Sequence, residues 1–254
     1  AYRVFKIERK MYGVESLDYL ESIFQKLLIN FTWWVNRKDA EGKNVFEGGF
    51  LGLDNIGVFN RSEELPTGGS LEQADSTGWM AFYSLQMLNI ALELAKTRPV
   101  YENIASKFFE HFIIIADAMT FRGGDGDEST KDALWDDKDK FYYDAIRYSD
   151  HHVESLHVRS LVGLIPLYAS LTIEPDLLNR YPSFKKRLNW FLVHQKKMSE
   201  RNIASMETRG VGERMLLSLV SKDRLLAILD RMLNEDEFLS EYGIRSLSKY
   251  HKDH

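Results

Sequence analysis

The chain has 254 residues, of which 44% are hydrophobic and 28% charged, a composition typical of a folded globular protein. Its formal net charge of −5 argues against a nucleic-acid-binding surface, and no apolar run is long enough to cross a bilayer. The absence of cysteine excludes disulfides, thiolate metal ligands and a cysteine nucleophile, and it favours a cytoplasmic location.

The first half of the chain is predicted to hold two long helices on either side of a connection. Residues 15–36 repeat apolar side chains at the i, i+3, i+4 spacing of a helix with one buried face. Residues 37–75 follow as a glycine-rich connection, in which Asp54 stands among the apolar residues of GGFLGLDNIGVFNR. Residues 76–96 are apolar nearly all round, which predicts a helix buried on most sides.

The middle of the chain predicts two further helices and a second connection. Residues 99–118 are amphipathic, and residues 119–153 form a long connection with a short strand expected over residues 141–148. Residues 155–171 are again nearly all apolar, so a buried helix with a kink at Pro166 is expected there.

The last third predicts an amphipathic helix at residues 183–197, one or two helices at 212–234 and a non-helical tail. Alternation of wholly apolar and one-faced helices favours two concentric helical layers, an all-α fold of the (α/α) six-hairpin toroid type. A ring of six hairpins needs twelve helices, whereas about seven or eight are expected here. We therefore expect residues 1–254 to be part of a single toroid domain whose C-terminal remainder is absent. The exposed inner faces of such a partial ring would favour a second copy or a complementing chain.

Carboxylates and aromatic side chains gather at the predicted junctions between loops and helices, and this combination suits a glycosidase. One carboxyl must protonate the leaving oxygen, and a second must activate water or attack the anomeric carbon. The apolar residues beside Asp54 in the sequence would favour its protonated form.

Other interpretations of these residues remain open. Asp75 could serve only as a helix N-cap, Trp33 and Trp34 could be core residues, and Arg159 could be held in a structural ion pair. The run DDKDK matches a solvated turn, and it misses the DDxxD motif of terpene cyclases. Neither GDGDES nor the closely spaced histidines have the spacing of an EF-hand or a zinc site, so no metal is expected.

Four segments together resemble one known family. The run NFTWWVNRKDAEGKNVFEGGFLGLDNIGVFNRSEELPTGGSLEQADSTGWMAFY, followed by WDDKDKFYYDAIR, VRSLVGLIPLYA and FLSEYGIRSLSKYH, is similar to the catalytic domain of glycoside hydrolase family 63. This family includes processing α-glucosidase (mannosyl-oligosaccharide glucosidase), and the resemblance spans most of residues 20–250. It implies a six-hairpin barrel, no cofactor, and inverting hydrolysis of α-glucosides or related oligosaccharides.

The resemblance also implies particular site residues. It places the general acid in the motif Gly52-Leu53-Asp54-Asn55, here at Asp54. Residues in the other matching motifs are expected to line the sugar site: Trp34, Asp75, Trp79, Tyr143, Asp144, Arg159, Tyr242 and Arg245. In the family the general base is a glutamate after a Trp-Arg-Gly-Pro type motif, so we expect it beyond residue 254 and expect this fragment alone to be inactive. The expected partner is an oligosaccharide or glycoside, with no nucleic acid and no membrane; the alternative is a carbohydrate-binding or scaffolding helical toroid without turnover.

Overall fold

The computed structural model describes residues 1–36, 45–46, 56–61, 63–66, 68–120, 134–150, 152–194 and 210–253. The fold is 56% helical and 15% strand, with several antiparallel sheets. The prediction of an all-α toroid is therefore wrong. The strands lie in the connections and in short apolar runs, where the sequence pattern fits a buried strand as well as a helix.

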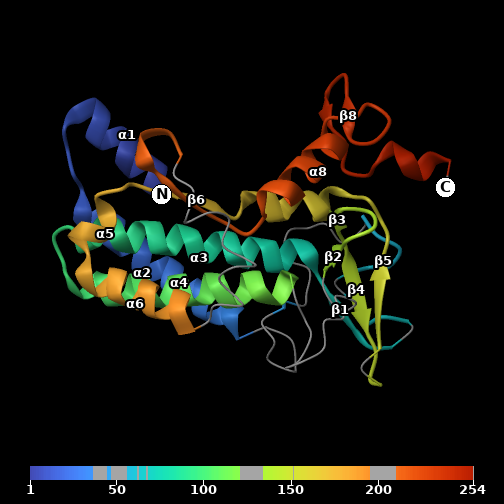
Figure 1. The fold of residues 1–254 in the computed structure, drawn as a ribbon, viewed down its shortest axis with the longest axis horizontal. Helices are drawn as coiled ribbons and strands as arrows, with labels where there is room; N and C mark the ends of the chain where they lie inside the picture. Colours follow the sequence, from blue (N-terminus) through green and yellow to red (C-terminus); the bar gives the residue numbers. More distant parts are fainter. Residues whose placement is uncertain are drawn as a thin grey trace.

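Helix α3 (Ala74–Ala95) lies in the middle of the fold and is buried along most of its length (Figure 1). Helices α2 (Leu17–Val35) and α4 (Val100–Thr120) pack against α3, and α6 (Pro182–His194) packs against α4. These helices confirm the predictions from apolar periodicity. They include the expectation that the helix at residues 76–96, which is α3, is buried nearly all round. None of the described helices is long and apolar enough to cross a membrane.

Shorter elements lie on the side of α3 away from α4 (Figure 1). They include α1 (Tyr2–Tyr12), which was not predicted, and the antiparallel pair of β6 (Ser170–Ile173) with β7 (Met215–Ser218). Helix α1 ends at Gly13, whose left-handed backbone, with φ of 69°, favours glycine. The four-residue helix α5 (Leu177–Arg180) follows β6.

A three-stranded antiparallel sheet lies at the N-terminal end of α3 (Figure 1). Its order is β1 (Ser70–Glu72), β4 (Asp144–Arg147), β5 (Val153–Leu156), and the central strand β4 is buried at all four residues. A small hairpin of β2 (Trp135–Asp136) and β3 (Phe141–Tyr142) precedes it. The strand predicted over residues 141–148 is confirmed in part, because this range holds two strands, β3 and β4, that are separated at Tyr143 and belong to different sheets.

The prediction of an apolar α-helix over residues 155–171 is wrong. The end of β5, the 3-10 helix η2 (Leu161–Tyr168) and the start of β6 occupy this range, and Pro166 lies within η2. An isolated proline removes a backbone donor, which disfavours a continuous α-helix there. The 212–234 prediction is confirmed only for α8 (Lys222–Met232), because β7 and the end of η3 (Val211–Glu213) precede it.

The tail carries the small hairpin of β8 (Leu239–Ser240) and β9 (Gly243–Ile244), followed by the 3-10 helix η4 (Lys249–Lys252). Phe238, just before this hairpin, is fully buried and stacks on Phe141 of β3 with ring centroids 5.7 Å apart. The tail therefore belongs to the same hydrophobic core as the helices.

Gly163 allows η2 to approach β3 closely. A Cβ added at this position would overlap the ring of Phe141 and the carbonyl oxygen of Tyr142. We expect Gly163→Ala to lower the free energy of unfolding by about 2–3 kcal/mol, because overpacking forces neighbouring groups to move. Urea denaturation measures this change. Gly57→Ala is the matched control, since no neighbouring atom of the described residues lies within 4 Å of its added Cβ; equal effects of the two substitutions would contradict the close contact.

Candidate functional site

The predicted general acid, Asp54, lies outside the described residues. The segment that follows it, residues 56–61, is described and lies beside β4 and β5. Ile56 and Phe59 line a small cavity of about 20 Å³ together with Asp144 and Ser160. A cavity of this size holds about one water molecule. The described residues thus bring the end of the glycine-rich stretch against a buried carboxylate.

Arg61, Asp75 and Asp144 form a buried ion-pair cluster, called the Arg61 cluster below. Arg61 Nη1 donates to Asp75 Oδ2 over 3.0 Å, and Arg61 Nη2 contacts the other oxygen, so this pair is bidentate. Arg61 Nε lies 2.8 Å from Asp144 Oδ2. None of the three side chains is more than 9% exposed, so the contacts are shielded from solvent.

The start of α3 fixes two members of this cluster. The backbone N–H of Ala74 donates to Asp144 Oδ1 over 2.9 Å, which joins the first turn of α3 to β4. Asp75 lies in that first turn, whereas Gln73 occupies the N-cap position. The interpretation of Asp75 as the N-cap is therefore wrong. A carboxylate in the first turn is nevertheless stabilised by the N-terminal end of the helix dipole.

Burial, together with the negative charge of Asp75, raises the pKa of Asp144 to about 6, although the nearby guanidinium of Arg61 opposes this shift. The cluster holds two carboxyl groups and one guanidinium. With both carboxyl groups ionised it would carry one unbalanced negative charge in a buried site, and one bound proton makes it neutral. This is the electrostatic setting in which a carboxyl group keeps its proton close to neutral pH.

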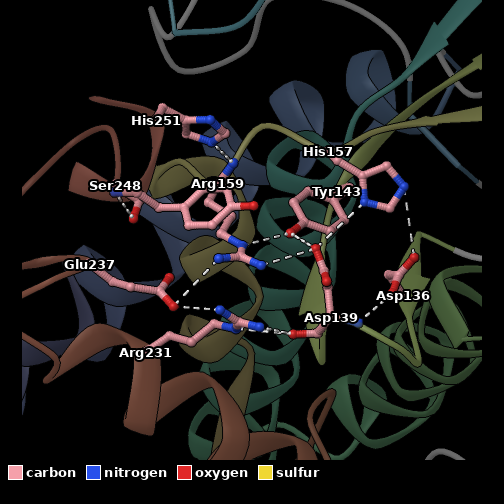
Figure 2. Close-up of polar contacts among 10 residues, drawn as sticks. Asp136, Asp139, Tyr143, His157, Arg159, Arg231, Glu237, Ser248 and His251 are labelled. Carbon is pink, nitrogen blue, oxygen red and sulfur yellow. Dashed lines mark hydrogen bonds and ion pairs between the residues drawn. The ribbon is translucent and has the colours of Figure 1, made fainter. Parts of the chain in front are cut away.

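A second polar network surrounds Arg159 and is called the Arg159 cluster (Figure 2). Arg159 Nη2 lies 3.3 Å from Asp139 Oδ2, and Nη1 lies 3.6 Å from Glu237 Oε1. Its guanidinium also lies 3.9 Å from the centre of the Tyr250 ring, a cation–π contact. Arg159 therefore has partners from both the β2–β3 hairpin and the tail.

Tyr143, Arg231 and His157 complete the Arg159 cluster. The hydroxyl of Tyr143 donates to Asp139 Oδ2 over 2.8 Å, and Arg231 donates to the backbone carbonyl of Asp139 and pairs with Glu237. Burial works against ionisation of Asp139, but the contacts of Tyr143 and Arg159 hold its pKa below the usual value. The exposed ring of His157 lies 4.9 Å from that of Tyr143, centre to centre. The side of the cluster that carries His157 therefore faces solvent.

The two clusters lie on opposite faces of the same short segments. Tyr143 points into the Arg159 cluster, and the next residue, Asp144, points into the Arg61 cluster. Likewise, Ser160 lines the small cavity while Arg159 points away from it. Successive side chains alternate in direction along extended backbone, which explains this division.

Four of the eight predicted sugar-site residues thus fall into the two clusters. Asp75 and Asp144 are brought together by Arg61, while Tyr143 and Arg159 meet in the second cluster. The other four predicted residues lie outside both clusters: Trp34, Trp79, Tyr242 and Arg245.

These four outlying residues have separate surroundings. Trp34 packs against the core and is edge-on to Trp33, which is 49% exposed, so the core interpretation fails for Trp33. Trp79 contacts Phe82, and Tyr242 is 92% exposed. Arg245 donates to backbone carbonyls within the tail, including that of Glu237.

The cationic member of the first cluster, Arg61, was not predicted from the sequence, and neither were Arg231 and Glu237. Arg61 lies 14 residues before Asp75 and 83 before Asp144, so no local spacing connects the three. The signal that could have found it is chemical, because two acids beside apolar segments need a buried cation. The structural ion pair expected for Arg159 is present. The run DDKDK forms the expected turn, and Asp139 within it belongs to the Arg159 cluster.

Comparison with known proteins gives one informative match. The chain is 68% identical, over 259 aligned residues, to Uncharacterized protein YMR196W of Saccharomyces cerevisiae. The match covers 100% of the chain but 24% of the yeast protein, so the chain spans about a quarter of that relative. No protein-family model matches the chain.

Removing the cation from the Arg61 cluster should be costly. We expect Arg61→Met to lower the free energy of unfolding by about 3–5 kcal/mol, because two carboxyl groups would remain buried without their partner. Denaturant titration measures the change. Arg180→Met is the control: it removes a cation from a pair with Asp176 whose side chains are 49% and 64% exposed, worth about 0–1 kcal/mol. A similarly small effect at Arg61 would show that the cluster contributes little.

The raised pKa of Asp144 predicts a pH-dependent stability. The pKa of an aspartate in an unfolded chain is about 3.9. Between about pH 4 and 6 the folded protein therefore binds more protons than the unfolded chain. Stability from this group therefore falls as pH rises through that window. We expect the stability of the native protein, minus that of Asp144→Asn, to fall by roughly 2–3 kcal/mol between pH 4 and 7. Urea titrations of both proteins at the two pH values measure it; a difference that stays constant or grows with pH would refute the shift.

Proposed function

We propose that this chain supplies the general acid, Asp54, and part of the sugar-binding surface of an inverting glycoside hydrolase acting on α-glucosides or related oligosaccharides. The observation that carries the proposal is the position of residues 56–61. This segment directly follows the Gly-Leu-Asp-Asn motif, and through Arg61 it is bonded to Asp75 and Asp144, two acids expected in the sugar site.

The local electrostatics support acid catalysis at this place. A general acid works best when its pKa lies near the working pH. The surroundings of Asp144 already raise the pKa of a carboxyl group to about 6, mainly by burial. We propose that Asp54, which precedes the 56–61 segment in the chain, protonates the leaving glycosidic oxygen. Asp144 and Asp75 are fully engaged by Arg61 and the α3 backbone, so their proposed role is to position the 56–61 segment.

The second half of an inverting reaction needs a carboxylate that activates water on the opposite face of the sugar. Such a pair stands about 6.5–9.5 Å apart, which leaves room for the water. The family resemblance assigns that base to a glutamate outside the motifs matched in residues 1–254. The activity is therefore a proposal about the full-length protein, of which this chain contributes the acid.

The Arg159 cluster has a supporting part in this proposal. Arg159 already contacts Asp139, Glu237 and Tyr250, so its side chain is held in one orientation. It also donates to the hydroxyl of Tyr143 over 3.3 Å. We propose that Arg159 positions Tyr143, which directly precedes Asp144, and thereby supports the wall of the sugar site.

The test is hydrolysis of an aryl α-glucoside and of glucose-type oligosaccharides by the full-length protein. We expect Asp54→Asn to lower kcat by about 10²–10⁴-fold, the usual contribution of general acid catalysis. Asp150→Asn is the control, because it removes an exposed aspartate of the β4–β5 turn that is a member of neither cluster. Proton NMR of the first-formed product should show the inverted anomer. Full activity of Asp54→Asn would exclude this residue as the acid, and sugar binding without any turnover by the native protein would instead indicate a carbohydrate-binding role.

A further inference from the structure

A large groove lies far from the Arg61 cluster. It is a groove of about 620 Å³ between α1, the C-terminal half of α3, β6 and α5, within the size range of small-molecule sites. Glu93 of α3 lines it, whereas Asp75 lies in the first turn of the same helix. Their separation of 18 positions in the sequence corresponds to about 27 Å along the helix axis. The groove is therefore separate from the proposed glycosidase site.

The one buried acid of the groove is already neutralised. Glu93 is 6% exposed, and its Oε1 lies 2.8 Å from Arg9 Nη1 and 2.7 Å from Lys96 Nζ. The hydroxyl of Tyr2 donates to its Oε2 over 2.9 Å. Burial disfavours the ionised form, but hydrogen bonds from Lys96, Tyr2 and Arg9 hold the pKa of Glu93 below its usual value. Glu93 thus stays ionised and fixes two cations at the floor of the groove.

The other carboxylates of the groove also have cationic partners. Asp176 pairs with Arg180 over 2.6 Å, and Glu174 pairs with Arg214 over 3.1 Å. The lining as a whole holds five cations and three carboxylates, an excess of two positive charges: Arg3, Lys6, Arg9, Lys96 and Arg180 against Glu93, Glu174 and Asp176. An anion entering the groove would meet no unbalanced carboxylate.

The excess charge lies on α1. Arg3 and Lys6 line the groove at positions i and i+3, which share one face of a helix. Within the described part of the chain, neither has a carboxylate within ion-pair distance, although Lys6 lies 5.4 Å from the centre of the Tyr2 ring. An arginine and a lysine so placed can bind two oxygens of one phosphate group, the guanidinium through its forked donors.

Four uncharged polar side chains of the lining are suited to hydroxyl groups. Gln86 and Asn89 of α3 contribute amides, and Ser170 and Thr172 of β6 contribute hydroxyls. These side chains donate and accept hydrogen bonds without carrying charge. We infer that the groove binds a small phosphate ester that carries hydroxyl groups, with Arg3 and Lys6 on the phosphate and the α3 and β6 side chains on the hydroxylated part.

Calorimetric titration of the full-length protein tests this inference, with a hexose 6-phosphate, inorganic phosphate and the unphosphorylated hexose as probes. We expect the ester to bind more tightly than phosphate, and the free hexose to bind least. The double variant Arg3→Gln/Lys6→Gln should weaken ester binding by about 10–100-fold, the usual loss when charged hydrogen bonds are removed. The matched control Lys26→Gln/Lys222→Gln removes two exposed lysines from α2 and α8, outside the groove, and should leave binding unchanged.

Three results would overturn the inference. These are no binding of the ester, equal weakening by both double variants, and binding to phosphatidic acid vesicles without binding of the soluble ester. The last would place the phosphate on a membrane lipid. None of these measurements depends on glycoside hydrolysis, so an inactive Asp54 variant that still binds the ester would leave the groove assignment intact.

Discussion

Arg61 bridges Asp75 and Asp144, and the arrangement of the candidate site depends on this contact. It joins three segments that are distant in sequence: the end of the glycine-rich stretch, the first turn of α3 and the central strand β4. A second buried pair, Arg147 Nε to Glu72 Oε1 at 2.7 Å, links β4 to β1 in the same sheet. Buried ion pairs add little net stability when complete but are costly to break. Their effect here is to fix one arrangement of α3 against the sheet.

The sequence predicts this fold unevenly, and the reason is the length of each pattern. Long helices such as α3 and α4 were found because apolar side chains repeat over several turns, which leaves little choice of structure. The apolar run at residues 155–171 does not form the expected α-helix, because Pro166 interrupts it and Gly163 allows a close contact with β3. Short strands have only a few residues in which to show alternation, so the mixed character of the fold was missed.

The side-chain pairings of the candidate site are likewise only partly predictable from the sequence. Asp75 and Asp144 were named as site residues and lie together, but the arginine between them was not named. Pairings that span 14 and 83 residues leave no spacing to recognise. The family resemblance placed these two acids among the expected sugar-site residues, and the three-dimensional structure shows that both are engaged by Arg61. Tyr242 illustrates the converse, since its place in a matching motif does not bring it into either cluster, and Arg245 reaches the Arg159 cluster only through the backbone carbonyl of Glu237.

The antiparallel pairing of β1 with β4 has a consequence for how the chain folds. Its register joins Ser70 to Arg147, so the sheet closes a loop that contains both α3 and α4. Closing such a long loop costs conformational entropy, and contacts between distant residues slow folding compared with local ones. The α3–α4 pair, by contrast, is connected by a short turn and can form locally. The nucleus of folding is therefore expected in the helices, with Asp144 reaching Arg61 only after the sheet has closed.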